Sequence, residues 1–134
     1  MSDGLAKRAI ACKGWRWMPG MLTVTGYRLV RPQHGMWRIT QHAPENHLDC
    51  VDPARHDFVP DLTDPATLGC VLALVRGAWA PARVVVYHQH GQPSWEINVE
   101  LPDGSMPCVE SAATEAEALV AALEAAEGRE VNDG

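Results

Sequence analysis

The chain has 134 residues, of which 46% are hydrophobic and 21% charged, and its formal net charge at pH 7 is −6. This length predicts one globular domain, residues 1–134, that buries a core without disulfides or metals. No apolar run approaches the roughly 18 residues that cross a bilayer, and scattered charges occupy the first residues, where a secretory signal would be apolar. We therefore expect a cytoplasmic protein without membrane partners.

Four cysteines are spread along the chain without any Cys-x-x-Cys pair: Cys12, Cys50, Cys70 and Cys108. In a chain without a signal segment, this pattern predicts reduced thiols. For Cys70 and Cys108 we expect burial as small hydrophobic side chains.

Charge is distributed unevenly. Residues 1–40 hold seven basic residues and one acid, whereas residues 100–134 hold one basic residue and nine acids. This asymmetry predicts either a dipolar surface for a partner or two solvated faces that attract each other across the fold. The second interpretation requires no partner and is the one we favour.

The first predicted element is a short helix at 5–13, which Gly14 ends as a left-handed cap. Trp15 and Trp17 then alternate with other residues, so that their indoles share one face of an extended segment. Pro19 and Gly20 predict a turn.

A hairpin or a bent pair of strands follows, with arms at 21–24 and 27–31 and with Gly26 supplying a positive φ. Residues 36–40 predict another short strand. Residues 41–60 hold three prolines and three histidines without regular apolar spacing, and we expect a long loop or lid.

Residues 61–79 predict the clearest helix, with Asp64 as its N-cap and Pro65 in its first turn. Gly69 inside this helix predicts close approach of another element, and Gly77 and Pro81 predict its end. Its apolar stripe comprises Leu68, Val71, Leu72 and Val75.

Three strands are predicted next, at 82–89, 94–101 and 106–111. The second strand alternates, with Trp95, Ile97, Val99 and Leu101 facing inward. A capping box at 114–117 opens a final helix that packs through Leu119, Val120 and Leu123. Gly128 caps this helix, and residues 129–134 form a frayed tail.

This order predicts an α+β fold in which helices pack on an antiparallel sheet: a helix and a hairpin, then a helix, three strands and a helix. Because one chain need not cover both faces of such a sheet, either a monomer or a homodimer is expected.

A metal site is one alternative, because His88 and His90 would share a face of a strand. A third ligand would have to come from Cys108 or His56, at no recognisable spacing. Residues at the end of a strand are usually solvated, so we expect neither a metal nor another cofactor.

A cysteine nucleophile with a histidine base is another alternative within the loop. It would use Cys50, Asp52, His56 and Asp57. No phosphate-binding glycine loop, zinc-protease motif or nucleophile elbow is present in the sequence. We therefore predict a protein without catalytic residues.

Nucleic-acid binding would use the basic first third, through Lys7, Arg8, Lys13 and Arg16. Trp15, Trp17, Tyr27 and Trp37 would serve as stacking platforms. The acidic net charge argues against this function.

Protein binding would instead use the two indoles or the acidic side chains of the last helix, which would mimic nucleic acid or dock on a basic host protein. The acidic candidates are Glu115, Glu117, Glu124, Glu127 and Glu130. A solvated helix face explains each glutamate equally well. Trp15 and Trp17 form either a partner surface or the corner of a small core, and we favour the core.

Three segments together carry a resemblance: GWRWMPGM at 14–21, DPATLGCVLALVR at 64–76 and TEAEALVAALEAA at 114–126. They resemble a family of small uncharacterised phage and prophage proteins of proteobacteria. The match is close over 9–26, 61–79 and 114–126. A weaker similarity is to the phage α/β/α sandwich domain.

The resemblance implies a bacterial host cytoplasm and a phage accessory role, and it transfers no catalytic residue. The first hypothesis is therefore protein binding, in particular as a counter-defence inhibitor. Nucleic-acid binding is the alternative, and a metal protein or enzyme is the third.

Overall fold

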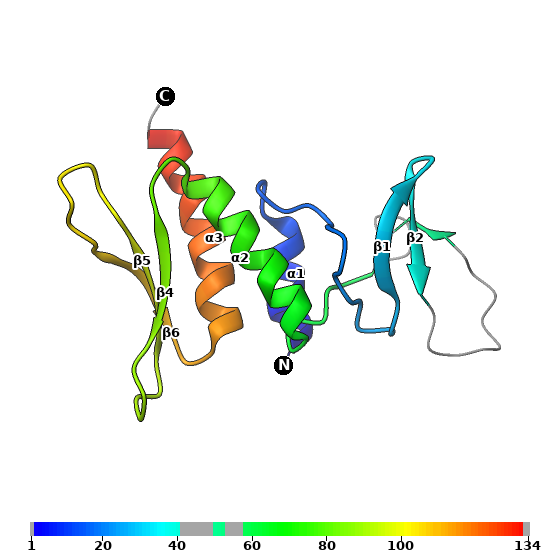
Figure 1. The fold of residues 1–134 in the computed structure, drawn as a ribbon, viewed down its shortest axis with the longest axis horizontal. Helices are drawn as coiled ribbons and strands as arrows, with labels where there is room; N and C mark the ends of the chain where they lie inside the picture. The colour runs from blue at the N-terminus through cyan, green and yellow to red at the C-terminus, as the bar shows by residue number, and fades with distance from the viewer. Residues whose placement is uncertain (1, 41–49, 53–57, 133–134) are drawn as a thin grey trace. The chain divides into compact units, whose positions relative to one another are not determined.

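The computed structural model describes residues 2–40, 50–52 and 58–132. Within them lie three helices and two three-stranded antiparallel sheets, which confirms the α+β prediction (Figure 1). The chain divides into two compact units: Met1–Ile10 with Arg16–Cys70 form unit 1, and Ala11–Trp15 with Val71–Gly134 form unit 2. None of the helices in these described ranges is both long and apolar enough to cross a membrane.

The sheet of unit 1 has the order β1-β2-β3, with β1 at Arg28–Gln33, β2 at Met36–Thr40 and β3 at Cys50–Val51. A tight turn at His34 and Gly35, both with positive φ, joins β1 to β2. Leu29 and Ile39 are paired across these strands and buried. The predicted strand at 36–40 is therefore confirmed.

The turn at Gly26 also forms as predicted. The Tyr27 carbonyl accepts from the Thr23 amide at 2.9 Å, and Gly26 has a φ of 97°. Residues 58–61 run beside this turn, because the Val24 amide donates to the Val59 carbonyl at 3.0 Å.

The prediction of one continuous loop at 41–60 is wrong where the structure describes this segment. β3 and the residues around Val59 pair through their backbones, so they need no apolar periodicity in the sequence. The rest of the predicted loop, 41–49 and 53–57, lies outside the described residues.

α1 spans Ser2–Ala11, slightly earlier than predicted. Gly14 is absent from the described glycines with positive φ, so the predicted left-handed cap is wrong. Gly14 instead matters for packing, because it has no side chain. A Cβ atom at Gly14 would lie 3.1 Å from Cδ1 of the buried Leu123.

α2 spans Pro65–Trp79, and the Asp64 Oδ2 atom accepts from the Thr67 amide at 2.9 Å, which confirms the N-cap. Gly69 is exposed with nothing near its missing side chain, so the predicted close approach is wrong. Gly77 lies within the helix and does not end it. The residues of this helix that are buried are Thr67, Val71, Leu74, Val75 and Trp79.

The sheet of unit 2 has the order β4-β5-β6, with β4 at Val84–His88, β5 at Trp95–Val99 and β6 at Cys108–Ala112. α3, Glu115–Asn132, packs on β5 and β6 (Figure 1). Ile97 and Val99 are buried as predicted, and Trp95 is half-buried. Leu101 is 42% exposed, because the strand ends before it.

The capping box of α3 is confirmed, since the Glu117 amide donates to Thr114 Oγ1 at 3.1 Å and this hydroxyl donates to Glu117 Oε1. The helix continues through Gly128 to Asn132, so the predicted cap is wrong and the predicted tail is helical up to that residue. Leucine and alanine supply enough buried surface to extend the helix past one glycine.

All four cysteines are free thiols. Cys108 is exposed at the start of the edge strand β6, so its predicted burial is wrong, and Cys70 is only half-buried. Burial raises the pKa of the Cys70 thiol.

Candidate functional site

The most distinctive feature of the described surface is the free edge of β4. Four strands lie at sheet edges, and three of them have features that natural proteins use to prevent pairing. β1 contains Pro32 and a register shift, β3 has two residues, and β6 has a register shift against β5. β4 pairs with β5 in regular register over all five residues. It is therefore the edge best suited to accept another strand.

One hydrogen bond shows which backbone groups of β4 point away from β5. The Glu100 amide donates to the Arg83 carbonyl at 2.8 Å, which makes these residues a hydrogen-bonded pair. Bonding alternates along an antiparallel ladder, so every second residue of β4 bonds to β5. The amides and carbonyls of Val84, Val86 and His88 therefore point away from the sheet. No described strand pairs with them.

A groove of about 510 Å³ runs along this edge. Residues 82–86 form one side of the groove, and Arg76 of α2 contributes to the other. Both Arg76 and Arg83 are exposed, and in the described chain neither forms an ion pair. The groove thus combines free backbone groups with two available positive charges.

This positive charge is unusual for its surroundings. Residues 71–134 contain ten acids, three arginines and no lysine. Two of the three arginines line this groove and no acid among the described residues does, so the charge of its lining is opposite to that of the surrounding chain, although Glu100 lines the adjoining hollow. Such a local reversal favours a negatively charged ligand.

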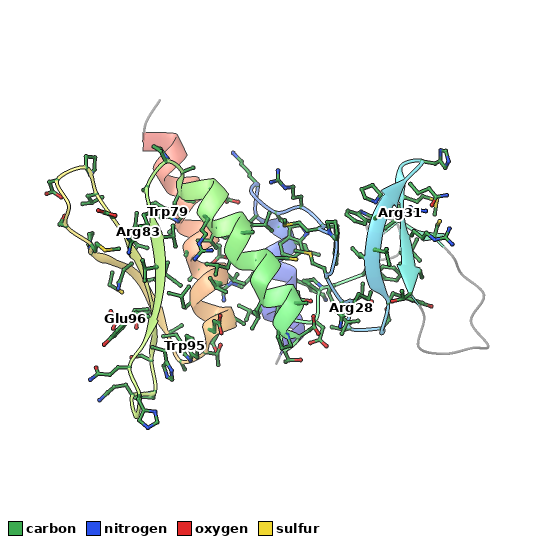
Figure 2. The ribbon with its side chains drawn as sticks, in the orientation of Figure 1. Arg28, Arg31, Trp79, Arg83, Trp95 and Glu96 are labelled. Carbon is green, nitrogen blue, oxygen red and sulfur yellow. The ribbon has the colours of Figure 1, made fainter. Side chains whose placement is uncertain are left out.

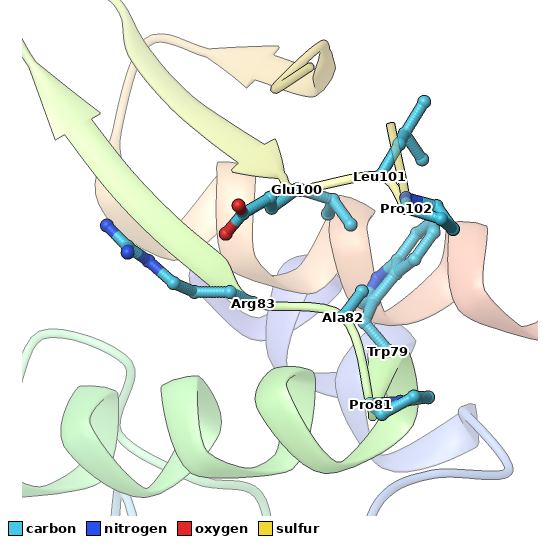
Figure 3. A pocket seen from close by; sticks show the side chains of 8 residues that line it. Trp79, Pro81, Ala82, Arg83, Glu100, Leu101 and Pro102 are labelled. Atoms are coloured by element: carbon cyan, nitrogen blue, oxygen red, sulfur yellow. The ribbon is translucent and has the colours of Figure 1, made fainter. Parts of the chain in front are cut away.

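A second hollow, of about 560 Å³, lies at the start of β4 (Figure 3). It shares Ala82 and Arg83 with the groove, and Figure 2 shows Trp79 and Arg83 at this end of the strand. The Trp79 indole donates to the Ala122 carbonyl at 3.0 Å, which fixes the ring. The other lining residues are Pro81, Val99, Glu100, Leu101 and Pro102.

The opposite end of β4 holds the histidines of the predicted metal site. His88 stacks on Trp95 with ring centroids 4.1 Å apart, and its Nε2 atom is 2.9 Å from the Gln92 carbonyl. Because β4 ends at His88, strand alternation does not bring His90 onto the same face. No group of three or more possible metal ligands occurs among the residues that the structure describes.

The predicted nucleophile and its base are not brought together in the described structure. Cys50 is half-buried in β3, and Asp52 follows this strand. His56 and Asp57 lie outside the described residues.

The two indoles of the predicted partner surface, Trp15 and Trp17, are both half-buried. Trp15 belongs to unit 2 and Trp17 to unit 1. Neither ring is an exposed patch that would by itself indicate a docking surface.

Glu117, Glu124 and Glu127 lie within roughly 80° of one another around the axis of α3, but Glu115 does not share their side. At about 100° per residue, Glu115 lies roughly 160° around the axis from Glu117. Glu117 accepts from Thr114, and Glu127 Oε1 accepts from the Lys13 amide. Glu117 and Glu127 therefore serve contacts within unit 2.

The four basic residues predicted to bind nucleic acid are exposed: Lys7, Arg8, Lys13 and Arg16. Sequence analysis missed a closer pair, since Arg31 of β1 lies directly opposite Arg38 of β2 and both are exposed. The sequence carries a signal for this pair, because a tight turn at residues 34–35 sets the register that places these two arginines opposite each other. Like charges at opposite positions cost stability, so this pair is suited to an anion.

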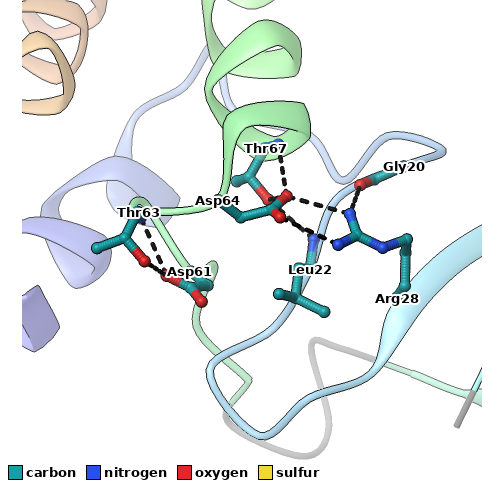
Figure 4. Close-up of polar contacts among 7 residues, drawn as sticks. All are labelled: Gly20, Leu22, Arg28, Asp61, Thr63, Asp64 and Thr67. Atoms are coloured by element: carbon teal, nitrogen blue, oxygen red, sulfur yellow. Dashed lines mark hydrogen bonds and ion pairs between the residues drawn. The ribbon is translucent and has the colours of Figure 1, made fainter. Parts of the chain in front are cut away.

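Arg28 is not available for such a role. Its guanidinium binds both carboxylate oxygens of Asp64 and also donates to the Gly20 carbonyl at 2.7 Å (Figure 4). The hydrogen bond from Arg28 holds the pKa of Asp64 at about 2, with further help from Thr67. The pKa of Arg28 is raised for the same reason.

Comparison of the chain with protein-family models, curated proteins and solved structures finds no match in any of the three. The candidate site therefore has to be judged from its own geometry and chemistry. Sequence analysis also missed the groove beside β4. The run of three valines directly after Arg83 was visible in the sequence, but a sequence does not say which strand of a sheet lies at its edge.

Proposed function

We propose that this chain acts by binding another protein through the free edge of β4. In this proposal the chain is an accessory protein of a phage or prophage, and it inhibits a defence protein in the cytoplasm of the bacterial host. The resemblance of the three segments at 14–21, 64–76 and 114–126 supports this origin. The binding mode rests on the regular, unpaired edge of β4.

An exposed edge strand without proline, bulge or lysine is a template for an added strand. Val84, Val86 and His88 offer three amides and three carbonyls in a row. Backbone pairing of this kind supplies affinity, and the side chains beside it supply selectivity. β4 has both, because the groove with its two arginines lies next to the edge.

The test is capture of a partner from nuclease-treated bacterial lysate, followed by reconstitution with the purified partner. Val86→Pro removes one outward amide, and proline is tolerated at an edge position. Val86→Ile retains that amide and is the matched control. We expect the partner to bind the wild type and the isoleucine variant but not the proline variant. Equal binding by all three, or no partner at all, would contradict the proposal.

Nucleic-acid binding is a second candidate, which the cross-strand pair of Arg31 and Arg38 favours. Phosphate contacts by two arginines would weaken steeply with salt. Retention of the protein on DNA or RNA should then fall in the double variant Arg31→Glu, Arg38→Glu. The same charge change at Arg76 and Arg83, in unit 2, is the control and should leave retention unchanged.

A further inference from the structure

We infer that the groove beside β4 takes an extended acidic segment of the partner, which places one large apolar side chain in the adjoining hollow. This inference rests on the proposed function and adds the chemistry of the partner. Its elements are the backbone groups of β4, the two arginines and the apolar hollow, and each selects for a different property of the ligand.

The backbone selects an extended conformation. The outward groups of Val84, Val86 and His88 are two residues apart, which is about 6.6–6.8 Å along a strand. Only a segment with the same repeat can bond to all of them. A helix or a compact turn cannot, because its own amides and carbonyls are already bonded within it.

The arginines select carboxylates. Arg83 comes directly before β4, and Arg76 lines the same groove from α2. A guanidinium donates two parallel hydrogen bonds to a carboxylate, which makes a strong and directional contact. A basic segment would meet two like charges at this point, so the groove discriminates between segments of opposite charge.

The hollow at the start of β4 selects an apolar side chain. Trp79, Pro81 and Pro102 supply rigid walls, and Leu101 is 42% exposed there. Because Ala82 and Arg83 belong to both spaces, a strand in the groove reaches this hollow at one of its ends. Burial of a leucine or phenylalanine side chain at this place would remove apolar surface of both partners from water.

The same chemistry argues against a second copy of this chain as the occupant. An edge-to-edge dimer would pair β4 with β4, whose sequence VVVYH contains no acid. The arginines of both copies would then surround the joined edges without carboxylates from the added strand. An acidic partner strand satisfies the arginines, whereas the chain's own β4 does not.

The experiment measures fluorescence anisotropy of a labelled ten-residue peptide of alternating valine and glutamate that ends in leucine, titrated with the full chain. Matched probes carry lysine in place of glutamate, or serine in place of the final leucine. We expect the glutamate probe to bind at least about tenfold more tightly than the lysine probe. The loss of leucine should weaken binding by about three- to tenfold.

Two double variants locate the contact. Arg76→Glu with Arg83→Glu should weaken binding of the glutamate probe by at least about tenfold. Lys7→Glu with Arg16→Glu changes the same amount of charge in unit 1 and should have no such effect. Both variants should unfold at the same temperature as the wild type, because all four side chains are exposed.

Several outcomes would overturn the inference. Equal binding of the glutamate and lysine probes, or an unchanged affinity in the Arg76 and Arg83 variant, would reject an acidic ligand; sensitivity of the natural partner to Val86→Pro would still support the proposed function. Absence of binding at about 1 mM chain would reject the added strand itself. A homodimer that Val86→Pro dissociates, seen by light scattering, would assign the edge to a second copy.

Discussion

Arg28 and Asp64 form a two-point ion pair, in which Nη1 lies 3.1 Å from Oδ2 and Nη2 lies 3.0 Å from Oδ1. The same carboxylate accepts from the amide and the hydroxyl of Thr67, both at 2.9 Å. Thr67 in turn accepts from the Leu22 amide through its hydroxyl (Figure 4). One carboxyl group thus connects the start of β1 with the first turn of α2.

Asp64→Ala should destabilise the protein by about 2 kcal/mol, because it removes an N-cap and leaves Arg28 without this partner. Asp64→Ser keeps a capping oxygen and should lower the free energy of unfolding by less than Asp64→Ala does. Unfolding by urea, followed by circular dichroism, measures both. A loss below about 0.5 kcal/mol for the alanine variant would show that other groups cap the helix.

The same carboxyl should make stability depend on pH in acid. Its pKa is about 2 in the folded protein against an ordinary value of 3.8, so the folded state favours the charged form. This stabilisation is complete above about pH 4 and is lost as the pH falls towards 2. Asp64→Asn retains a cap but does not titrate, so its deficit against the wild type should shrink over this range. A constant deficit would contradict the ion pair.

Gly69→Ala should stabilise the protein by up to about 1 kcal/mol. The glycine lies inside α2, is exposed and has no atom within 4 Å of the added Cβ position. Alanine lowers the entropy of the unfolded chain and favours the helix without any clash. Thermal unfolding measures the change. A destabilised variant would mean that another group occupies this surface.

Gly14→Ala, unlike Gly69→Ala, should destabilise the protein, by about 1–2 kcal/mol. Its Cβ would lie 3.1 Å from Cδ1 of Leu123, which is fully buried and has little room to move. Leu123→Val shortens the opposing side chain, so the double variant should recover part of the loss. If the stability losses of the two single variants simply added in the double variant, residues 14 and 123 would not be in contact.

Cys108 should be alkylated by iodoacetamide, whereas the buried Cys12 should be protected in the folded protein. Partial desolvation of the Cys108 thiol and the neighbouring Glu96 raise its pKa, so its reaction should accelerate more than usual as the medium becomes alkaline. Glu96→Gln should increase the rate at neutral pH. Mass spectrometry of timed samples identifies the modified residue, and equal rates at both cysteines would contradict the burial of Cys12.

The sequence predicted those elements whose signals are local. The cap at Asp64, the turn at Gly26 and the capping box at Thr114 each depend on a few neighbouring residues. The amphipathic pattern of residues 115–126 likewise identified the buried face of α3. Such features require no knowledge of the rest of the chain.

Features that depend on distant residues were missed or wrong. Gly14 looked like a helix cap, but its role is set by Leu123, more than a hundred residues away. Cys108 looked like a core residue, yet it begins an edge strand. The candidate site was missed for the same reason. The order of the strands shows that one edge of β4 is unpaired, and the folded chain brings Arg76 to the groove beside it.

α2 has a consequence for anyone who wishes to divide or recombine this protein. The boundary between the two units falls after Cys70, which leaves six helical residues on one side and nine on the other. An isolated helix shorter than about 12–15 residues is barely stable in water. A cut at this boundary would therefore remove the helix from both fragments, so a functional module for transfer to another scaffold must include the whole of Pro65–Trp79.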